Sequence, residues 1–134
     1  MIPVFALATP NATATTPFSS AFVDDVSSSA TIGSWMAPPS NVTAGATISF
    51  TSTGAAFHSV QLSRAGTHVW NVTLLDGSTS FSLPAISPDP LGTGSITAAV
   101  SAADAPGFDA KAFDVLTTKG KLVRASGAQA TFTR

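Results

Sequence analysis

Apolar and polar residues alternate in short segments along most of the chain after residue 30. Because neighbouring side chains on a β-strand point to opposite faces, this alternation predicts strands that bury one face. Gly, Pro and Asp-Gly signals separate the segments at intervals of roughly 8–12 residues, which is typical of sandwiches and barrels. The expected strands cover 30–37, 46–52, 57–64, 67–75, 79–83, 95–103, 112–118 and 121–133. They predict an all-β fold, an antiparallel β-sandwich of about 7–9 strands.

The segment HVWNVTLLDGSTSFSLP, residues 68–84, has the pattern of a β-hairpin. Asp76-Gly77 is a strong signal for a two-residue type I′ turn, because Asp, Asn and Gly accept the positive φ that this turn needs. Pairing outward from that turn places apolar residues together on one face. The expected pairs are Leu74 with Thr79, Val72 with Phe81, and Trp70 with Leu83.

The preceding turn, at residues 65–67, predicts a second hairpin. A three-residue loop closed by Arg64 and His68 would place Leu62 opposite Trp70 and Val60 opposite Val72, again on one apolar face. Residues 57–84 are therefore expected to form a three-stranded antiparallel unit with Trp70 and Val72 at its centre. A later strand repeats the alternation, with Ile96, Ala98, Val100 and Ala102 facing inward.

The N-terminal part differs from the rest of the chain. Residues 9–30 are rich in Thr, Ser, Ala and Pro around one apolar island, 18–26, which favours an extended N-terminal segment or linker over 1–29 and a sandwich domain over 30–134. The start, IPVFALA, is strand-like. Ala6-Leu7-Ala8 fits the small-x-small pattern of a signal-peptidase site, yet no basic region precedes it. Either Met1 is an expression start within a longer precursor, or the match is chance.

Composition excludes several classes of protein. Charged residues make up 10%, against about 25% in typical domains, and Glu is absent, which disfavours a helical protein. The net charge of −1 gives no attraction to nucleic acid or to an anionic membrane. The absence of Cys excludes disulfides, thiol nucleophiles and Cys-ligated zinc. No apolar run approaches the roughly 20 residues of a membrane-spanning helix.

Three segments together resemble fibronectin type III or immunoglobulin-like domains of bacterial surface or secreted proteins. They are SWMAPPSNVTAGATISF, FHSVQLSRAGTHVWNVTLLDGSTSFSLP and GSITAAVSAADAPG, within residues 30–133. The resemblance implies an adhesive or accessory domain without catalysis. Two features depart from it. Tyr is absent, so there is no tyrosine corner. A tight turn at Asp76-Gly77 would also keep its two strands in one sheet, whereas the type III chain crosses between sheets near that point.

Few residues suggest chemistry. His58 and His68 are expected on the surface or rim, at opposite ends of the three-stranded unit, too far apart to share a metal. No Gly-x-Ser-x-Gly elbow supports a Ser-His-Asp triad. Asp24 and Asp25 are adjacent and so would point to opposite sides. A calcium site is conceivable around the later acids, Asp104, Asp109 and Asp114, although solvated loop carboxylates explain them better. We therefore predict no catalytic, cofactor or metal residues, and no cofactor.

Other polar and aromatic residues have simpler interpretations. Asn11, Asn41 and Asn71 begin formal glycosylation sequons, which matter only in a host that glycosylates secreted proteins. The basic residues near the C-terminus are interpreted as protection of an edge strand; they are Lys111, Lys119, Lys121 and Arg124. Trp35 is interpreted as a core residue, although it is the best candidate for an exposed sugar-binding ring.

These observations favour a non-catalytic β-sandwich module, secreted or at the cell surface, for adhesion, spacing or protein interaction within a larger surface protein or assembly. Its partner would be a protein or a cell surface, or a second copy of itself, with neither nucleic acid nor a membrane span involved. One alternative is a self-assembling fibre or shell subunit, in which IPVFALA adds to a neighbour's sheet. Another alternative is a carbohydrate-binding module that uses Trp35. The sequence does not identify the binding residues.

Overall fold

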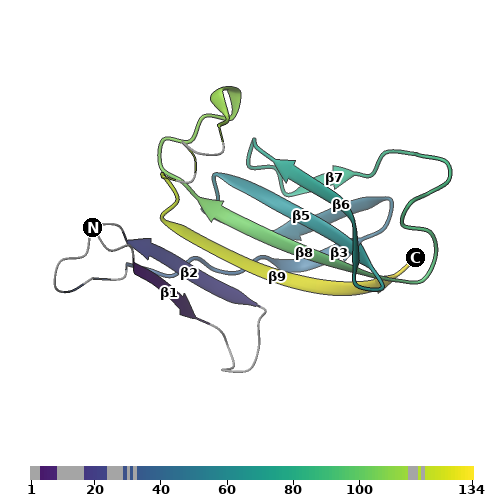
Figure 1. The fold of residues 1–134 in the computed structure, drawn as a ribbon, viewed down its shortest axis with the longest axis horizontal. Helices are drawn as coiled ribbons and strands as arrows, with labels where there is room; N and C mark the ends of the chain where they lie inside the picture. Colours follow the sequence, from purple (N-terminus) through teal and green to yellow (C-terminus); the bar gives the residue numbers. More distant parts are fainter. Residues whose placement is uncertain are drawn as a thin grey trace.

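The computed structural model describes residues 4–8, 17–23, 29, 31, 33–114, 118 and 120–134. The strands are β1 (Val4–Ala8), β2 (Phe18–Val23), β3 (Ser40–Ala44), β4 (Thr47–Thr51), β5 (Phe57–Arg64), β6 (Thr67–Leu74), β7 (Ser80–Ser82), β8 (Ser95–Asp104) and β9 (Arg124–Thr133), with a short 3₁₀ helix, η1 (Ala110–Ala112). A six-stranded sheet runs in the order β1-β2-β9-β8-β5-β6, and a three-stranded sheet runs β3-β4-β7. All strand pairs are antiparallel, and the expected antiparallel β-sandwich is confirmed (Figure 1).

The core lies between the two sheets. The large sheet contributes Val60 and Leu62 from β5 and the inward residues of β8, while β4 contributes Ile48 and Phe50 from the small sheet. Ile96, Ala98, Val100 and Ala102 are all buried, which confirms the alternation predicted for this strand. Leu91, from the loop between β7 and β8, is also fully buried in this cluster. Alternation along β5 and β8 therefore gives the sandwich its interior.

The hairpin of β5 and β6 has the predicted register along most of its length. Leu62 lies opposite Trp70 and Val60 opposite Val72. The predicted closure of the turn is wrong, because Arg64 pairs with Thr67, which leaves a two-residue loop in which Ala65 and Gly66 both have positive φ. Val69 is an extra residue without a partner on β5, which is a β-bulge. Beyond it the register shifts by one residue, so that Trp70 lies opposite Leu62.

The predicted hairpin at Asp76-Gly77 is wrong. A type I′ turn needs positive φ at both central residues, and of these two only Gly77 has it. The Asp76 carboxylate instead accepts a hydrogen bond from the Ser78 backbone N–H at 3.0 Å. The chain then crosses to the other sheet, where β7 pairs with β4. Trp70 is consequently half-buried on an edge strand and not at the centre of a three-stranded unit.

The structure also differs from the predicted strands over residues 30–44 and 112–118. No strand forms among the described residues of 30–37, and the segment after Pro38-Pro39 forms β3 instead, which was missed. The side chains of β3 do not alternate regularly between the two faces, because Asn41 has positive φ and the register with β4 shifts between Ser40 and Thr43. The strand expected at 112–118 does not form in residues 112–114 and 118, and η1 ends at Ala112. Residues 115–117 lie outside the described part of the chain.

Strands β1 and β2 extend the large sheet beyond β9 (Figure 1). β2 pairs with the first part of β9, with Phe18 opposite Gly127 and Ala21 opposite Arg124. The ring of Phe18 lies directly over Gly127, where an added Cβ would clash with the Phe18 Cε1 atom. Ser20 supports the contact, since its hydroxyl donates to the Ala125 carbonyl at 3.1 Å. The large sheet thus includes strands from both sides of the expected boundary at residues 29 and 30, and that boundary stays a prediction.

Candidate interaction surface

Charged side chains of the described residues lie at the ends of strands and in loops. Arg64, Asp104 and Arg124 are terminal residues of their strands, and the others lie outside strands: Asp76, Asp89, Asp109, Lys111, Asp114, Lys121 and Arg134. The outer faces of the sheets instead carry hydroxyl and amide groups. Some of these bond across strands, as in Ser59 to Asn71 at 3.3 Å and Thr43 to Ser49 at 2.6 Å. The broad faces within the described part of the chain are therefore polar but uncharged.

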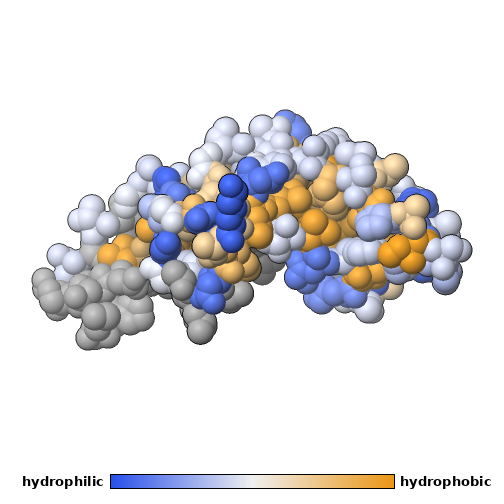
Figure 2. All heavy atoms as spheres, turned by 90° about the horizontal axis from the view of Figure 1, so that it is seen from above, coloured by the Kyte–Doolittle hydropathy of each residue, from blue (hydrophilic) through white to orange (hydrophobic). Residues whose placement is uncertain are grey.

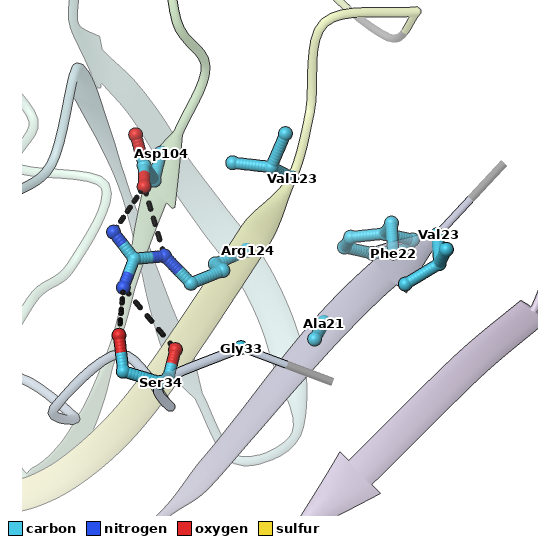
Figure 3. A pocket seen from close by; sticks show the side chains of 8 residues that line it. All are labelled: Ala21, Phe22, Val23, Gly33, Ser34, Asp104, Val123 and Arg124. Atoms are coloured by element: carbon cyan, nitrogen blue, oxygen red, sulfur yellow. Dashed lines mark hydrogen bonds and ion pairs between the residues drawn. The ribbon is translucent and has the colours of Figure 1, made fainter. Parts of the chain in front are cut away.

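A pocket of about 390 Å³ opens beside β2 and the start of β9. Its lining comes from β2, the segment before β3, and the adjacent ends of β8 and β9. The lining residues are Ala21, Phe22, Val23, Gly33, Ser34, Asp104, Val123 and Arg124. Figure 3 shows a polar side, where Arg124 lies between Asp104 and Ser34, and an apolar side with Phe22 and Val23 on β2.

Arg124 uses its guanidinium group to hold the polar side together. Its Nε donates to Asp104 Oδ2 at 2.9 Å, and a terminal nitrogen forms an ion pair with the same oxygen. The other terminal nitrogen donates to the Ser34 carbonyl at 3.2 Å and to its hydroxyl at 3.0 Å (Figure 3). The two charges in the lining thus neutralise each other, and the pocket offers a ligand little net charge.

The apolar side of the pocket is partly open to solvent. Phe22 and Val23 are half-buried, and 36% of Val123 is exposed. Trp35 follows Ser34 in the chain and is 45% exposed, so its interpretation as a core residue is wrong. The segment runs without strand structure here, and the next residue, Met36, is the one that enters the interior, with 3% exposed. We call Phe22, Val23 and Val123 the apolar wall.

His58 is buried, so its interpretation as a surface or rim histidine is wrong. Only 2% of it is exposed, and its ring packs edge-on against Phe50 with centroids 5.0 Å apart. Burial lowers the pKa of His58, while the Ser78 backbone and the Asp76 carboxylate act more weakly in the opposite direction. Neither ring nitrogen makes a regular hydrogen bond to the described part of the protein. His58 does not line the pocket.

His68 is exposed, as predicted for a surface residue, and its Nδ1 lies 2.9 Å from the Ser63 hydroxyl. It is placed near the turn at the far end of the hairpin from His58. Within the described residues, no three His, Cys, Asp or Glu side chains gather as a metal-binding group.

The acidic candidates have separate structural roles. Asp104 pairs with Arg124, while Asp109 accepts the Lys111 N–H at 2.9 Å and caps η1. The Asp114 carbonyl accepts the Thr118 N–H at 2.9 Å. Asp24 and Asp25 lie outside the described residues.

Arg124 does not protect an edge, so that interpretation is wrong for it, because the start of β9 pairs with both β8 and β2. Lys121 instead donates to the Gly107 carbonyl at 2.9 Å, and Lys111 is exposed in η1. Asn41 and Asn71 of the sequons are both exposed. Lys119 and Asn11 lie outside the described residues.

No helix in the described residues has the length and apolar character needed to cross a membrane. No protein-family model, curated protein or solved structure matches the chain. What the protein does is therefore inferred from its own residues and their geometry.

Proposed function

We propose that the chain is a non-catalytic β-sandwich module, secreted or at the cell surface, that contacts a protein or cell-surface partner within a larger surface protein or assembly. The observation that carries the proposal is the apolar wall of Phe22, Val23 and Val123 beside a pocket whose charged residues pair with each other. Such a site favours an uncharged partner surface. Burying its apolar area on binding would supply affinity, at about 25 cal/mol per Å² before the costs of association.

The strand order supports an immunoglobulin-like or fibronectin type III-like arrangement. The order β9-β8-β5 corresponds to the neighbours G-F-C of such sandwiches, and β3-β4-β7 corresponds to A-B-E. The crossing from β6 to β7 also lies where the type III chain changes sheets. Under this proposal, β1 and β2 are additions beside the last strand of the sandwich.

The arrangement of polar groups favours binding over catalysis. A general acid or base must reach a substrate atom, yet Asp104 is already paired with Arg124, and Arg124 also donates to Ser34. His58 is enclosed between the sheets beside Phe50. The titratable groups that line the pocket are thus bonded to each other and His58 is enclosed, whereas Val123 of the apolar wall is partly exposed.

Adhesion of beads that carry the chain to cells of the source organism tests the proposal. Val123→Asp places a charge on the apolar wall, and Ile86→Asp places the same charge on another exposed apolar residue, in the loop after β7, where 49% of Ile86 is exposed. We expect Val123→Asp to reduce adhesion at least about tenfold, which corresponds to about 1.4 kcal/mol. Ile86→Asp should adhere like the wild type. Equal adhesion of the two variants would overturn the assignment of the wall.

The exposure of Trp35 favours a carbohydrate-binding module as a second candidate, since an open indole ring offers a flat face to a sugar. Binding to neutral glycans that is lost in Trp35→Ala but kept in Val123→Asp would replace the first proposal with this one. Glycan binding that is insensitive to Trp35→Ala would remove this candidate.

A further inference from the structure

Strand β6 forms one edge of the six-stranded sheet. It pairs with β5 on one side, and β7, the next strand in the chain, belongs to the other sheet. Within the described residues, no backbone hydrogen bond from a loop or turn reaches Thr67–Leu74. The N–H and C=O groups along the outer edge of β6 therefore remain available to another strand.

The sequence of β6 gives this edge little protection. Natural edge strands commonly carry Lys or Pro, or are kept short. β6 has eight residues, THVWNVTL, with neither a charged residue nor Pro. The bulge at Val69 interrupts the part near the turn and leaves Trp70–Leu74 as a regular stretch of five.

The inward side chains of that stretch are incompletely covered. Trp70, Val72 and Leu74 are all half-buried, and Phe81 on neighbouring β7 is half-buried as well. Trp70, Leu74 and Phe81 pack against the core cluster without entering it fully. Figure 2 views the molecule from above, the side of Figure 1 on which β6 and β7 lie, and hydrophobic residues show there between polar ones. A strand added beside β6 would cover this apolar margin.

We propose that β6 pairs with β6 of a second copy, antiparallel and about a two-fold axis at Val72. In this register Trp70 lies opposite Leu74 of the second copy, Val72 opposite Val72, and Asn71 opposite Thr73. Apolar residues then meet apolar ones and polar residues meet polar ones, and the bulge stays outside the paired stretch. A shift of the axis by half a residue would place each apolar side chain beside a polar one.

Charge also suits this occupant. The paired stretch Trp70–Leu74 carries no charged side chain, so no like charges meet across it. The pairing joins two six-stranded sheets into one continuous sheet, and the same patch serves both copies, so the contact closes as a dimer.

This inference rests on the proposed role as an interaction module, because it names one partner, and the chain offers a clean test because it has no cysteine. Val72→Cys places two thiols opposite each other on the axis, whereas Thr67→Cys places them outside the paired stretch. Under mild oxidation we expect Val72→Cys to form a covalent dimer and Thr67→Cys to stay monomeric. The wild type should show twice the chain mass by light scattering over a concentration series.

Three outcomes would overturn the pairing: a wild-type mass that stays monomeric, equal cross-linking of the two variants, or a dimer that Val72→Cys does not capture. The last would indicate a different contact, such as one through β1. A second pair of variants tests the pairing if cysteine disturbs the fold. Val72→Lys should abolish the dimer, because it places two cations on the axis. Thr67→Lys, outside the paired stretch, should leave the dimer intact. A monomeric chain whose adhesion still depends on Val123 would contradict the pairing alone. A dimer with adhesion insensitive to Val123→Asp would contradict the proposed function alone.

Discussion

His58 shows how a single residue ties stability to pH. Its ring is almost fully buried, and burial lowers its pKa below the ordinary value of 6.5, because the charged ring loses its hydration. In the unfolded chain the ring regains the ordinary value. Between the two values the unfolded chain therefore binds more protons than the folded one, and acid favours unfolding.

We expect the free energy of unfolding to be highest above pH 6.5 and to fall as the pH decreases from there toward the lowered pKa of His58. Urea unfolding at several pH values between about 5 and 8 measures this slope. His58→Leu should remove most of it, since Leu fills the site without a titrating group. His68→Gln, on the exposed histidine, serves as the control and should keep the wild-type slope. An unchanged slope in His58→Leu would show that another group causes the dependence.

At the scale of elements, β2 depends on a narrow contact with β9. Four residues of each strand pair, and the ring of Phe18 fills the space that Gly127 leaves empty. Ser19, Ser20 and Ala21 are buried in this seam, although the first two are polar. Covering a glycine with an aromatic ring from the next strand stabilises a sheet where the glycine itself packs poorly.

Gly127→Val should therefore loosen β2 while leaving the core of the sandwich intact. Loss of the Phe18 contact removes about 1.5–3 kcal/mol of local stabilisation, so amide hydrogen exchange of Ser19–Ala21 should accelerate at least about tenfold. Exchange in β5 and β8 should change little. Gly45→Ala is the matched control, since nothing lies within 4 Å of an added Cβ at Gly45 and no positive φ is required there. Unchanged exchange in β2 would contradict the proposed role of the Phe18–Gly127 contact.

Whole-molecule architecture could be predicted where alternation and burial agree. β5 and β8 lie inside the large sheet, and their inward residues follow the two-residue period, so their bounds and faces were clear from the sequence. Alternation does not say which sheet a strand joins. Thr79–Leu83 suits either sheet, and the hydrogen bond from the Ser78 N–H to Asp76 accompanies the crossing that the Asp-Gly signal obscured.

The candidate site was harder to predict. Arg124 and Asp104 are twenty residues apart and meet because β8 and β9 pair, which sequence spacing alone does not reveal. Trp35 was expected in the core and is exposed, whereas His58 was expected at the surface and is buried. Hydrophobicity predicts the average burial of a residue type and not the path of one segment. A strand at 30–37 was expected from its apolar residues, yet the first strand of the small sheet begins at Ser40, directly after Pro38-Pro39. Proline has no backbone N–H to donate to a neighbouring strand.

The location of the chain tests the central claim, that this sandwich is an extracellular interaction module, most directly. An antibody against the folded chain would be applied to intact and to permeabilised cells of the source organism, and to the culture medium. We expect intact cells or the medium to hold nearly all of the signal. A signal that appears only after permeabilisation would contradict an extracellular location.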